Sequence, residues 1–153
     1  MSEPADGNAV DRTVESIQAA ITQVVIDRGW GLTQLPDQLI WSLELQGERS
    51  YTCYIQIEPL EGQAIFYGVL PHTVAEDART EAAVAVAAVN YGLAVGKFEL
   101  DLTDGELRFS NGIDVTGTVL DPVVFARMAD HTIEMLDAYT PTLSNRVPLP
   151  DLG

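Results

Sequence analysis

Apolar and polar residues alternate along the middle of the chain in a way that predicts strands. Residues 39–45 alternate apolar and polar side chains, which predicts a first strand. Residues 51–58 are rich in β-forming residues and predict a second strand, and residues 63–70 predict a third. Only short glycine-containing turns, at 46–50 and 59–62, separate them. Three consecutive segments of this kind predict an antiparallel meander.

A different period, close to that of an α-helix, precedes the meander. Apolar residues recur at helical spacing over about 9–28. Asn8 is suited to the N-cap of this helix, and Gly29 is suited to its C-terminal end. The pattern predicts a first helix at about 9–28.

Two more helices are predicted after the meander. Thr73 and Glu76 have the spacing of a capping box, and the helix that follows is expected to end near Asn90. Asp121, an acidic N-cap, stands directly before a proline at the first position of the last helix. Pro141 is expected to end that helix, since proline cannot donate the next backbone hydrogen bond.

Between these helices, residues 97–103 alternate again, with Phe98, Leu100 and Leu102 on one face. Asp104-Gly105 is typical of a tight hairpin turn, and the alternation returns in 106–109. Asn111-Gly112 is expected to break this second strand, before a short β-rich segment at 113–119. The element order is therefore helix, three strands, helix, two strands, helix, which is an α+β domain with a mostly antiparallel sheet packed against helices.

The second predicted helix is apolar on every side from Ala82 to Val89. A helix of this kind must be covered all round, and a single sheet covers only one side. Either helices of the same chain cover the remaining sides, or a second copy of the chain does. Because the small alanine side chains would permit close backbone approach, the pattern favours a homodimer that packs through this helix. The predicted interface comprises Ala82, Ala85, Val86, Val89, Tyr91 and Phe98.

The length of 153 residues and the 46% hydrophobic content fit one globular domain. We place this domain at 9–146, between flexible tails at 1–8 and 147–153. No apolar run approaches the ~20 residues needed to cross a bilayer. The acidic, polar start of the chain is unlike a secretory signal, so a cytoplasmic location is expected.

The chain carries 8 Lys and Arg against 23 Asp and Glu, a net charge of −15. Binding to nucleic acid or to an anionic membrane needs a basic patch, and here the basic residues are scattered singly. Both classes are therefore excluded. The charge is explained by solubility or by attraction of a basic partner segment or divalent cations.

Candidate chemistry is sparse. Residues 92–97 contain two glycines and a lysine, but their spacing and the following Phe98 do not match a phosphate-binding loop. Residues 101–106 are acidic, yet the glycine stands at the fifth position rather than the sixth of a calcium loop. His131 and Glu134 share a helix face, but two residues do not make a metal site. No cofactor and no catalytic group is predicted.

The lone Cys53 lies within a predicted strand and is interpreted as a small buried hydrophobe. A reactive thiol would need a basic neighbour, and Arg49 is the nearest in the sequence. This offers little support for a reactive role.

Several short segments together resemble bacterial YbjN-domain proteins. They are Ile65–Pro71, Asn90–Leu93, Gly96–Asp101 and Asp104–Phe109, followed by the last helix with its Leu-Asp-Pro start. The resemblance covers about residues 10–146. It implies a fold similar to type III secretion chaperones, homodimers packed around the second helix and the sheet, and no catalytic residues.

Two hypotheses for the function follow. The first is a non-enzymatic homodimeric binding module, chaperone-like or a regulatory adaptor, that captures a protein segment in a groove or at a sheet edge. The second is a regulatory protein that binds a small molecule or a cation without catalysis.

Overall fold

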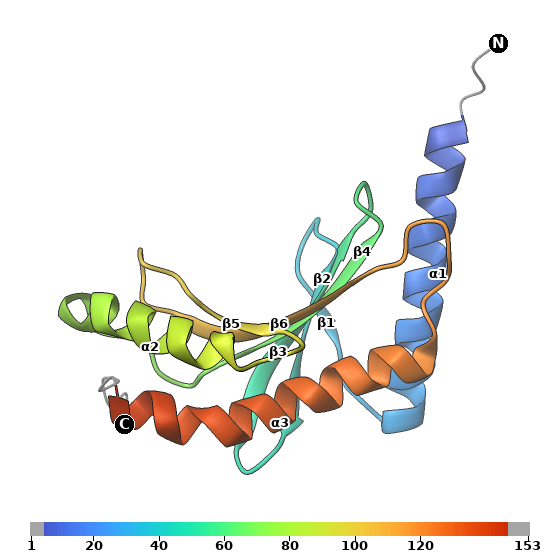
Figure 1. Ribbon diagram of the computed structural model, residues 1–153. Helices are drawn as coiled ribbons and strands as arrows, with labels where there is room; N and C mark the ends of the chain where they lie inside the picture. Colours follow the sequence, from blue (N-terminus) through green and yellow to red (C-terminus); the bar gives the residue numbers. More distant parts are fainter. Residues whose placement is uncertain (1–4, 147–153) are drawn as a thin grey trace.

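Three α-helices, one short 3-10 helix and a single antiparallel sheet form the computed structural model, which describes residues 5–146 (Figure 1). The predicted tail at 147–153 and the first four residues of the predicted tail at 1–8 lie outside this range. The helices are α1 (Ala5–Arg28), the short η1 (Glu76–Ala78), α2 (Arg79–Tyr91) and α3 (Pro122–Arg146). The strands are β1 (Thr33–Gln34), β2 (Ile40–Gln46), β3 (Ser50–Glu58), β4 (Gln63–Val69), β5 (Lys97–Leu100) and β6 (Leu107–Asp114).

The sheet has six strands in the order β1-β2-β3-β4-β6-β5, and every pair is antiparallel. β2, β3 and β4 form the predicted meander, and their ends match the prediction to within one residue. This α+β architecture confirms the predicted fold class. β1 was not predicted, since its two exposed residues carry no apolar pattern.

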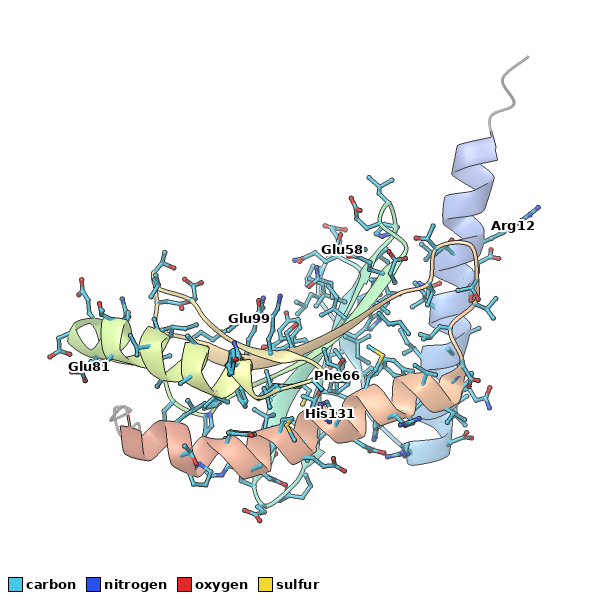
Figure 2. All side chains as sticks on the ribbon, in the orientation of Figure 1. Arg12, Glu58, Phe66, Glu81, Glu99 and His131 are labelled. Carbon is cyan, nitrogen blue, oxygen red and sulfur yellow. The ribbon has the colours of Figure 1, made fainter. Side chains whose placement is uncertain are left out.

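Helices cover only one face of the sheet. Burial alternates strictly along β3, where Cys53 and Ile55 are fully buried while Tyr54 is half-buried on the opposite face. Figure 2 shows Phe66 and His131 between the sheet and α3, whereas Glu58 and Glu99 lie on the far side of the sheet. The other face of the sheet is therefore left without a covering layer in the described part of the chain.

The first helix begins earlier than expected. α1 starts at Ala5, so Asn8 lies inside the helix and the prediction that it caps the helix was wrong. The buried stripe of α1 includes Ile17, Ile21 and Val24, which were predicted. Its end at Gly29, with φ of 67°, is confirmed.

The predicted capping box was also wrong. Instead of Thr73 capping a helix directly, the 3-10 turn η1 precedes α2, and neither helix start has a side-chain cap. Arg79 holds this segment by donating to the carbonyl oxygens of Val74, Leu102 and Thr103. A tertiary anchor on the β5–β6 loop thus replaces the local cap.

The start of α3 is as predicted, and its end is not. The Val123 N–H donates to Asp121 Oδ1 at 2.8 Å, which confirms the acidic cap. The helix continues through Pro141 to Arg146. Thr140 and Leu143 are 2% and 1% exposed, so burial on both sides of the proline favours continuation despite the missing hydrogen bond.

The second strand pair differs from the prediction at both ends. β5 stops at Leu100, and Leu102 is 62% exposed rather than packed on the sheet. β6 runs through the predicted break at Asn111-Gly112 and ends at Asp114, so residues 115–119 are not a strand. The long neighbour β4 explains this continuation, because it pairs with β6 as far as Asp114.

Candidate functional site: the outer face of α2 and the end of β6

The predicted dimer interface is largely occupied by the chain itself. Ala82, Ala85 and Val86 are at most 8% exposed. Phe98 is 2% exposed, because it packs edge-on against Phe109 and Tyr139. Of the six predicted interface residues these four belong to the core of the single chain, whereas Val89 is half-buried and Tyr91 is 96% exposed.

A second row on α2 faces outward. Val84, Ala87, Ala88 and Tyr91 are all exposed, with Val84 at 68%, and they recur at i, i+3, i+4 and i+7. Residues at this spacing lie on one face of a helix. We call these four residues the outer stripe. The alanine-rich run in the sequence did not show which of its faces the sheet would cover.

Asn90 fixes the end of α2 against the edge strand. Its side-chain amide donates to the Phe98 carbonyl at 2.9 Å, and its Oδ1 accepts the Phe98 N–H at 2.8 Å. These two bonds resemble those of a paired strand, and they satisfy the outward-facing N–H and C=O of Phe98 at the edge of the sheet. They also hold the C-terminal end of α2 beside this edge of the sheet.

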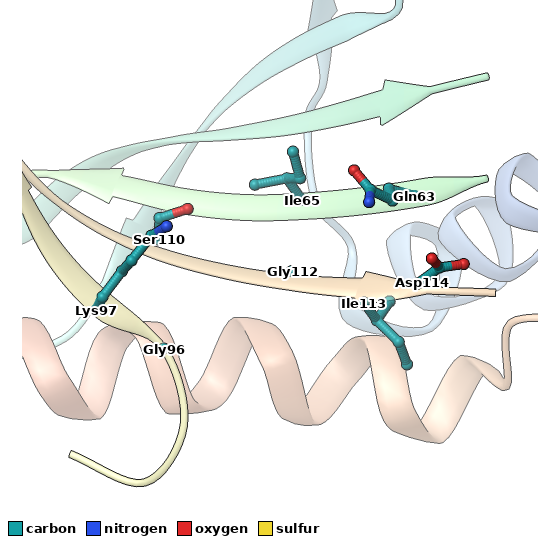
Figure 3. Close-up of a pocket in the computed structure, with 8 residues that line it drawn as sticks. All are labelled: Gln63, Ile65, Gly96, Lys97, Ser110, Gly112, Ile113 and Asp114. Carbon is teal, nitrogen blue, oxygen red and sulfur yellow. The ribbon is translucent and has the colours of Figure 1, made fainter. Parts of the chain in front are cut away.

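β5 covers only part of β6. Its first residue, Lys97, pairs with Ser110, and β6 continues past it to Asp114 (Figure 3). Within the described residues, no strand pairs with this part of β6 on that side. The chain leaves the edge at Gly96, which has a φ of +75°. A Cβ at Gly96 would also lie 2.3 Å from Phe109 Cζ, so both conformation and space require glycine.

We call residues 111–114 the free end of β6. Gly112 and Asp114 are exposed, and Ile113 is half-buried. A Cβ built on Gly112 would come no closer than 3.6 Å to any other atom, which is ordinary van der Waals contact. The sequence does not reveal this feature, because Asn111-Gly112 predicts the end of the strand, whereas β6 continues to Asp114.

A hollow lies on each side of this free end. On the open face of the sheet, the first hollow has a volume of about 450 Å³ (Figure 3). It is lined by Gln63, Ile65, Gly96, Lys97, Ser110, Gly112, Ile113 and Asp114. On the helix side, the second has a volume of about 480 Å³. It is lined by Val95, Asn111, Val124, Arg127, Met128, Asp130, His131 and Glu134.

The acidic loop at 101–106 uses its carboxylates for turn formation. Asp101 Oδ1 accepts both the hydroxyl and the N–H of Thr103, and these bonds lower the pKa of Asp101. Asp104 Oδ1 accepts the Glu106 N–H. Among the described residues, no group of three His, Cys, Asp or Glu side chains is arranged to hold a metal ion.

The other residues considered as candidates in the sequence, His131, Cys53 and residues 92–97, are held in contacts that maintain the fold. His131 Nε2 is hydrogen-bonded to the Val95 carbonyl oxygen at 3.1 Å, and the ring packs edge-on against Phe109. Cys53 is fully buried, and burial raises the pKa of its thiol to about 12. Residues 92–97 lead into a strand and not into a helix N-terminus. No helix in the described residues is both long enough and apolar enough to span a membrane.

Two solved structures share this arrangement of helices and sheet. One is YbjN from E. coli, with a TM-score of 0.59 and 15% identity over 78% of this chain and 90% of that chain. The other is the HopA1–SchA chaperone–effector complex, with a TM-score of 0.59 and 11% identity over 81% of this chain and 92% of that chain. The fold is that of YbjN and the type III secretion chaperones. No protein-family model and no curated protein matches this sequence.

Proposed function

We propose that the protein is a non-enzymatic, homodimeric binding module that captures a segment of another protein, as a chaperone or a regulatory adaptor in the cytoplasm. The observation that carries this proposal is the outer stripe of α2, an apolar row that the chain's own core leaves exposed. Solvent exposure of such a row is unfavourable, and burial against another protein relieves it.

The outer stripe suits a second copy of the same helix. Ala87 and Ala88 allow two backbones to approach closely, and Val84 and Tyr91 flank them at one-turn spacing. No charged side chain belongs to the stripe, so two copies can pack there although each carries a net charge of −15. This moves the proposed dimer contact from Ala82, Ala85, Val86 and Phe98 to the opposite face of the same helix.

Support for capture of a protein segment comes from fold and charge. A chain of the HopA1–SchA chaperone–effector complex shares the fold. The charge of −15 favours a basic partner segment. The solved structures compared above are described as a chaperone–effector complex and a proposed transcription regulator, and neither description is that of an enzyme.

Sedimentation velocity tests the dimer. We expect the wild-type protein to sediment as a dimer at micromolar concentration and Val84→Asp to sediment as a monomer. Val119→Asp is the matched control, because Val119 lies in a distant loop and is 70% exposed, against 68% for Val84. A monomeric wild-type protein, or equal dimerisation of both variants, would contradict the proposed interface.

Capture is tested by co-purification from the native host under the same conditions. We expect a stoichiometric protein partner with the wild-type chain, retained by Val119→Asp. The absence of any partner would count against capture of a protein segment while leaving the dimer in place.

The alternative function is a regulator that binds a small molecule or a cation. The hollow at Lys97, Ser110 and Asp114 offers one cation, one hydroxyl and one carboxylate on an open surface. A thermal-shift screen with calcium, magnesium and metabolites distinguishes the two functions. A saturable rise in melting temperature supports the function of a ligand-binding regulator, and the absence of a shift with every compound in the set excludes that function.

A further inference from the structure

We propose that the free end of β6 is the site at which a basic, extended segment of a partner protein adds to the sheet as a further strand. This inference rests on the proposed capture of a protein segment, and it names where and by what chemistry the segment is held. It follows from the direction of the β6 backbone, the early end of β5 and the hollows on both sides of the edge.

The backbone groups of Gly112 and Asp114 point away from the sheet. The Leu107 carbonyl accepts the Leu70 N–H, and the Val115 N–H donates to the Gly62 carbonyl. The backbone N–H and C=O groups of the odd-numbered residues of β6 therefore point toward β4. Because these groups alternate in direction along a strand, the backbone N–H and C=O groups of the even-numbered residues point toward the β5 side. β5 begins opposite Ser110, which leaves the N–H and C=O of Gly112 unpaired by any strand in the described residues.

These groups are accessible. Gly112 is exposed and has no side chain, and the preceding loop turns away at Gly96 toward His131 on α3. Unpaired strand edges readily accept another strand. The free end spans residues 111–114, and strands rise by ~3.3 Å per residue, so a guest strand of about four residues fits beside it.

The hollows match the period of a guest strand. Successive side chains of a strand point to opposite faces, so those of a strand beside residues 111–114 would enter the two hollows alternately. On the helix side, Val124 and Met128 provide apolar contact, and Glu134 provides a carboxylate. On the open face, Ile65 and Ser110 suit a β-branched side chain.

The net charge of −15 favours a basic guest. Two carboxylates, Asp130 and Glu134, and one guanidinium, Arg127, line the helix-side hollow. Asp130 is already paired with Arg28 at 2.8 Å, whereas Glu134 and Arg127 make no ion pair within the described part of the chain. A lysine or arginine entering the helix-side hollow would place its stem on Met128 and its charge near Glu134. A second copy of β6 is a poorer occupant, because residues 110–114 contain one aspartate and no basic residue.

A peptide of alternating lysine and valine, about nine residues long, is the probe, since this length exceeds the free end on both sides. Two variants at one position form the critical pair. Gly112→Ala retains the outward N–H, and Gly112→Pro removes it without breaking the ladder to β4, because that N–H does not face β4. Thermal unfolding checks that both variants fold.

We expect the peptide to bind wild type and Gly112→Ala with affinities within about twofold, and Gly112→Pro at least about tenfold more weakly, a loss of 1.4 kcal/mol or more. Hydrogen exchange of the Gly112 amide should slow when the peptide is bound. Glu134→Gln should lower the affinity for the lysine–valine peptide, and a peptide of alternating glutamate and valine should not bind to the wild-type protein.

The outcomes separate this site from the proposed function. Equal binding of the peptide to wild type and to folded Gly112→Pro, or no binding to either, overturns the strand-addition site. If a natural partner still co-purifies with Gly112→Pro, capture stands and only its location is wrong. If Gly112→Pro instead lowers the oligomeric state without peptide, a second copy occupies the edge and the proposal is overturned.

Discussion

The Tyr51 hydroxyl donates a 2.7 Å hydrogen bond to Asp137 Oδ1, which joins β3 to α3 across 86 positions of the sequence. The same carboxylate oxygen accepts the Glu48 N–H at 3.0 Å. Gly47 lies so close that a Cβ there would approach Asp137 Oδ2 to 2.6 Å. One carboxylate thus holds the β2–β3 turn and the buried tyrosine against the last helix.

Removal of this hydroxyl should destabilise the fold. We expect Tyr51→Phe to lower the free energy of unfolding by about 1–2 kcal/mol, because a part-buried carboxylate loses a donor. Tyr54→Phe is the control, since Tyr54 lies on the same strand and its hydroxyl has no hydrogen-bond partner among the described residues. Urea denaturation at neutral pH measures both, and equal effects of the two substitutions would contradict this role of Tyr51.

The same pair should make stability depend on alkaline pH. Burial, followed by the hydrogen bond to Asp137, raises the pKa of Tyr51 from 10.0 to about 12. The folded protein then holds this proton more tightly than the unfolded chain, so the stabilisation is full below pH 10 and is lost as the pH rises toward 12. Urea denaturation across this window should show a steeper loss for wild type than for Tyr51→Phe. Parallel curves would contradict the assignment.

Gly105 should tolerate alanine far less well than Gly117. Both have left-handed backbones, with φ of +81° and +74°. A Cβ on Gly105 would lie 2.1 Å from the Val74 carbonyl oxygen, whereas Gly117 has nothing within 4 Å. We expect Gly117→Ala to cost about 1–2 kcal/mol for the backbone conformation alone, and Gly105→Ala to cost about 3 kcal/mol or more. Similar midpoints in thermal or urea unfolding would show that the steric contact relaxes.

Asn90→Ala should loosen α2 from the edge of the sheet. Two hydrogen bonds to the Phe98 backbone are lost, for which we expect about 2 kcal/mol of destabilisation. Thr80→Ala, an exposed substitution on the same helix, should change stability by less than about 0.5 kcal/mol. Faster hydrogen exchange at the Phe98 amide in Asn90→Ala would support the role of this contact, and unchanged exchange would argue against it.

The sequence alone predicted the meander closely because its signal is local. Each of β2, β3 and β4 has one buried and one open face, so period-2 alternation marks the strands and glycine turns mark their ends. The end of α1 at Gly29 and the cap at Asp121 were predictable for the same reason: each depends on a few adjacent residues.

The missed boundaries depend on distant partners. α3 passes through Pro141 because Thr140 and Leu143 are buried, and β6 passes through Gly112 because β4 pairs alongside it. Leu102 leaves the sheet because the turn closes at Asp101, whose N–H donates to the Glu106 carbonyl. In each case tertiary packing outweighed a local preference.

For the candidate site, the sequence determined that α2 carries more apolar surface than one sheet can cover and that the molecule is strongly acidic. Tertiary structure decided which face remained outside: Ala82, Ala85 and Val86 turned inward, and Val84 and Tyr91 stayed exposed. It also decided that the end of β6 lacks a strand partner on the β5 side within the described residues, because strand register is a relation between two segments and no local pattern encodes it.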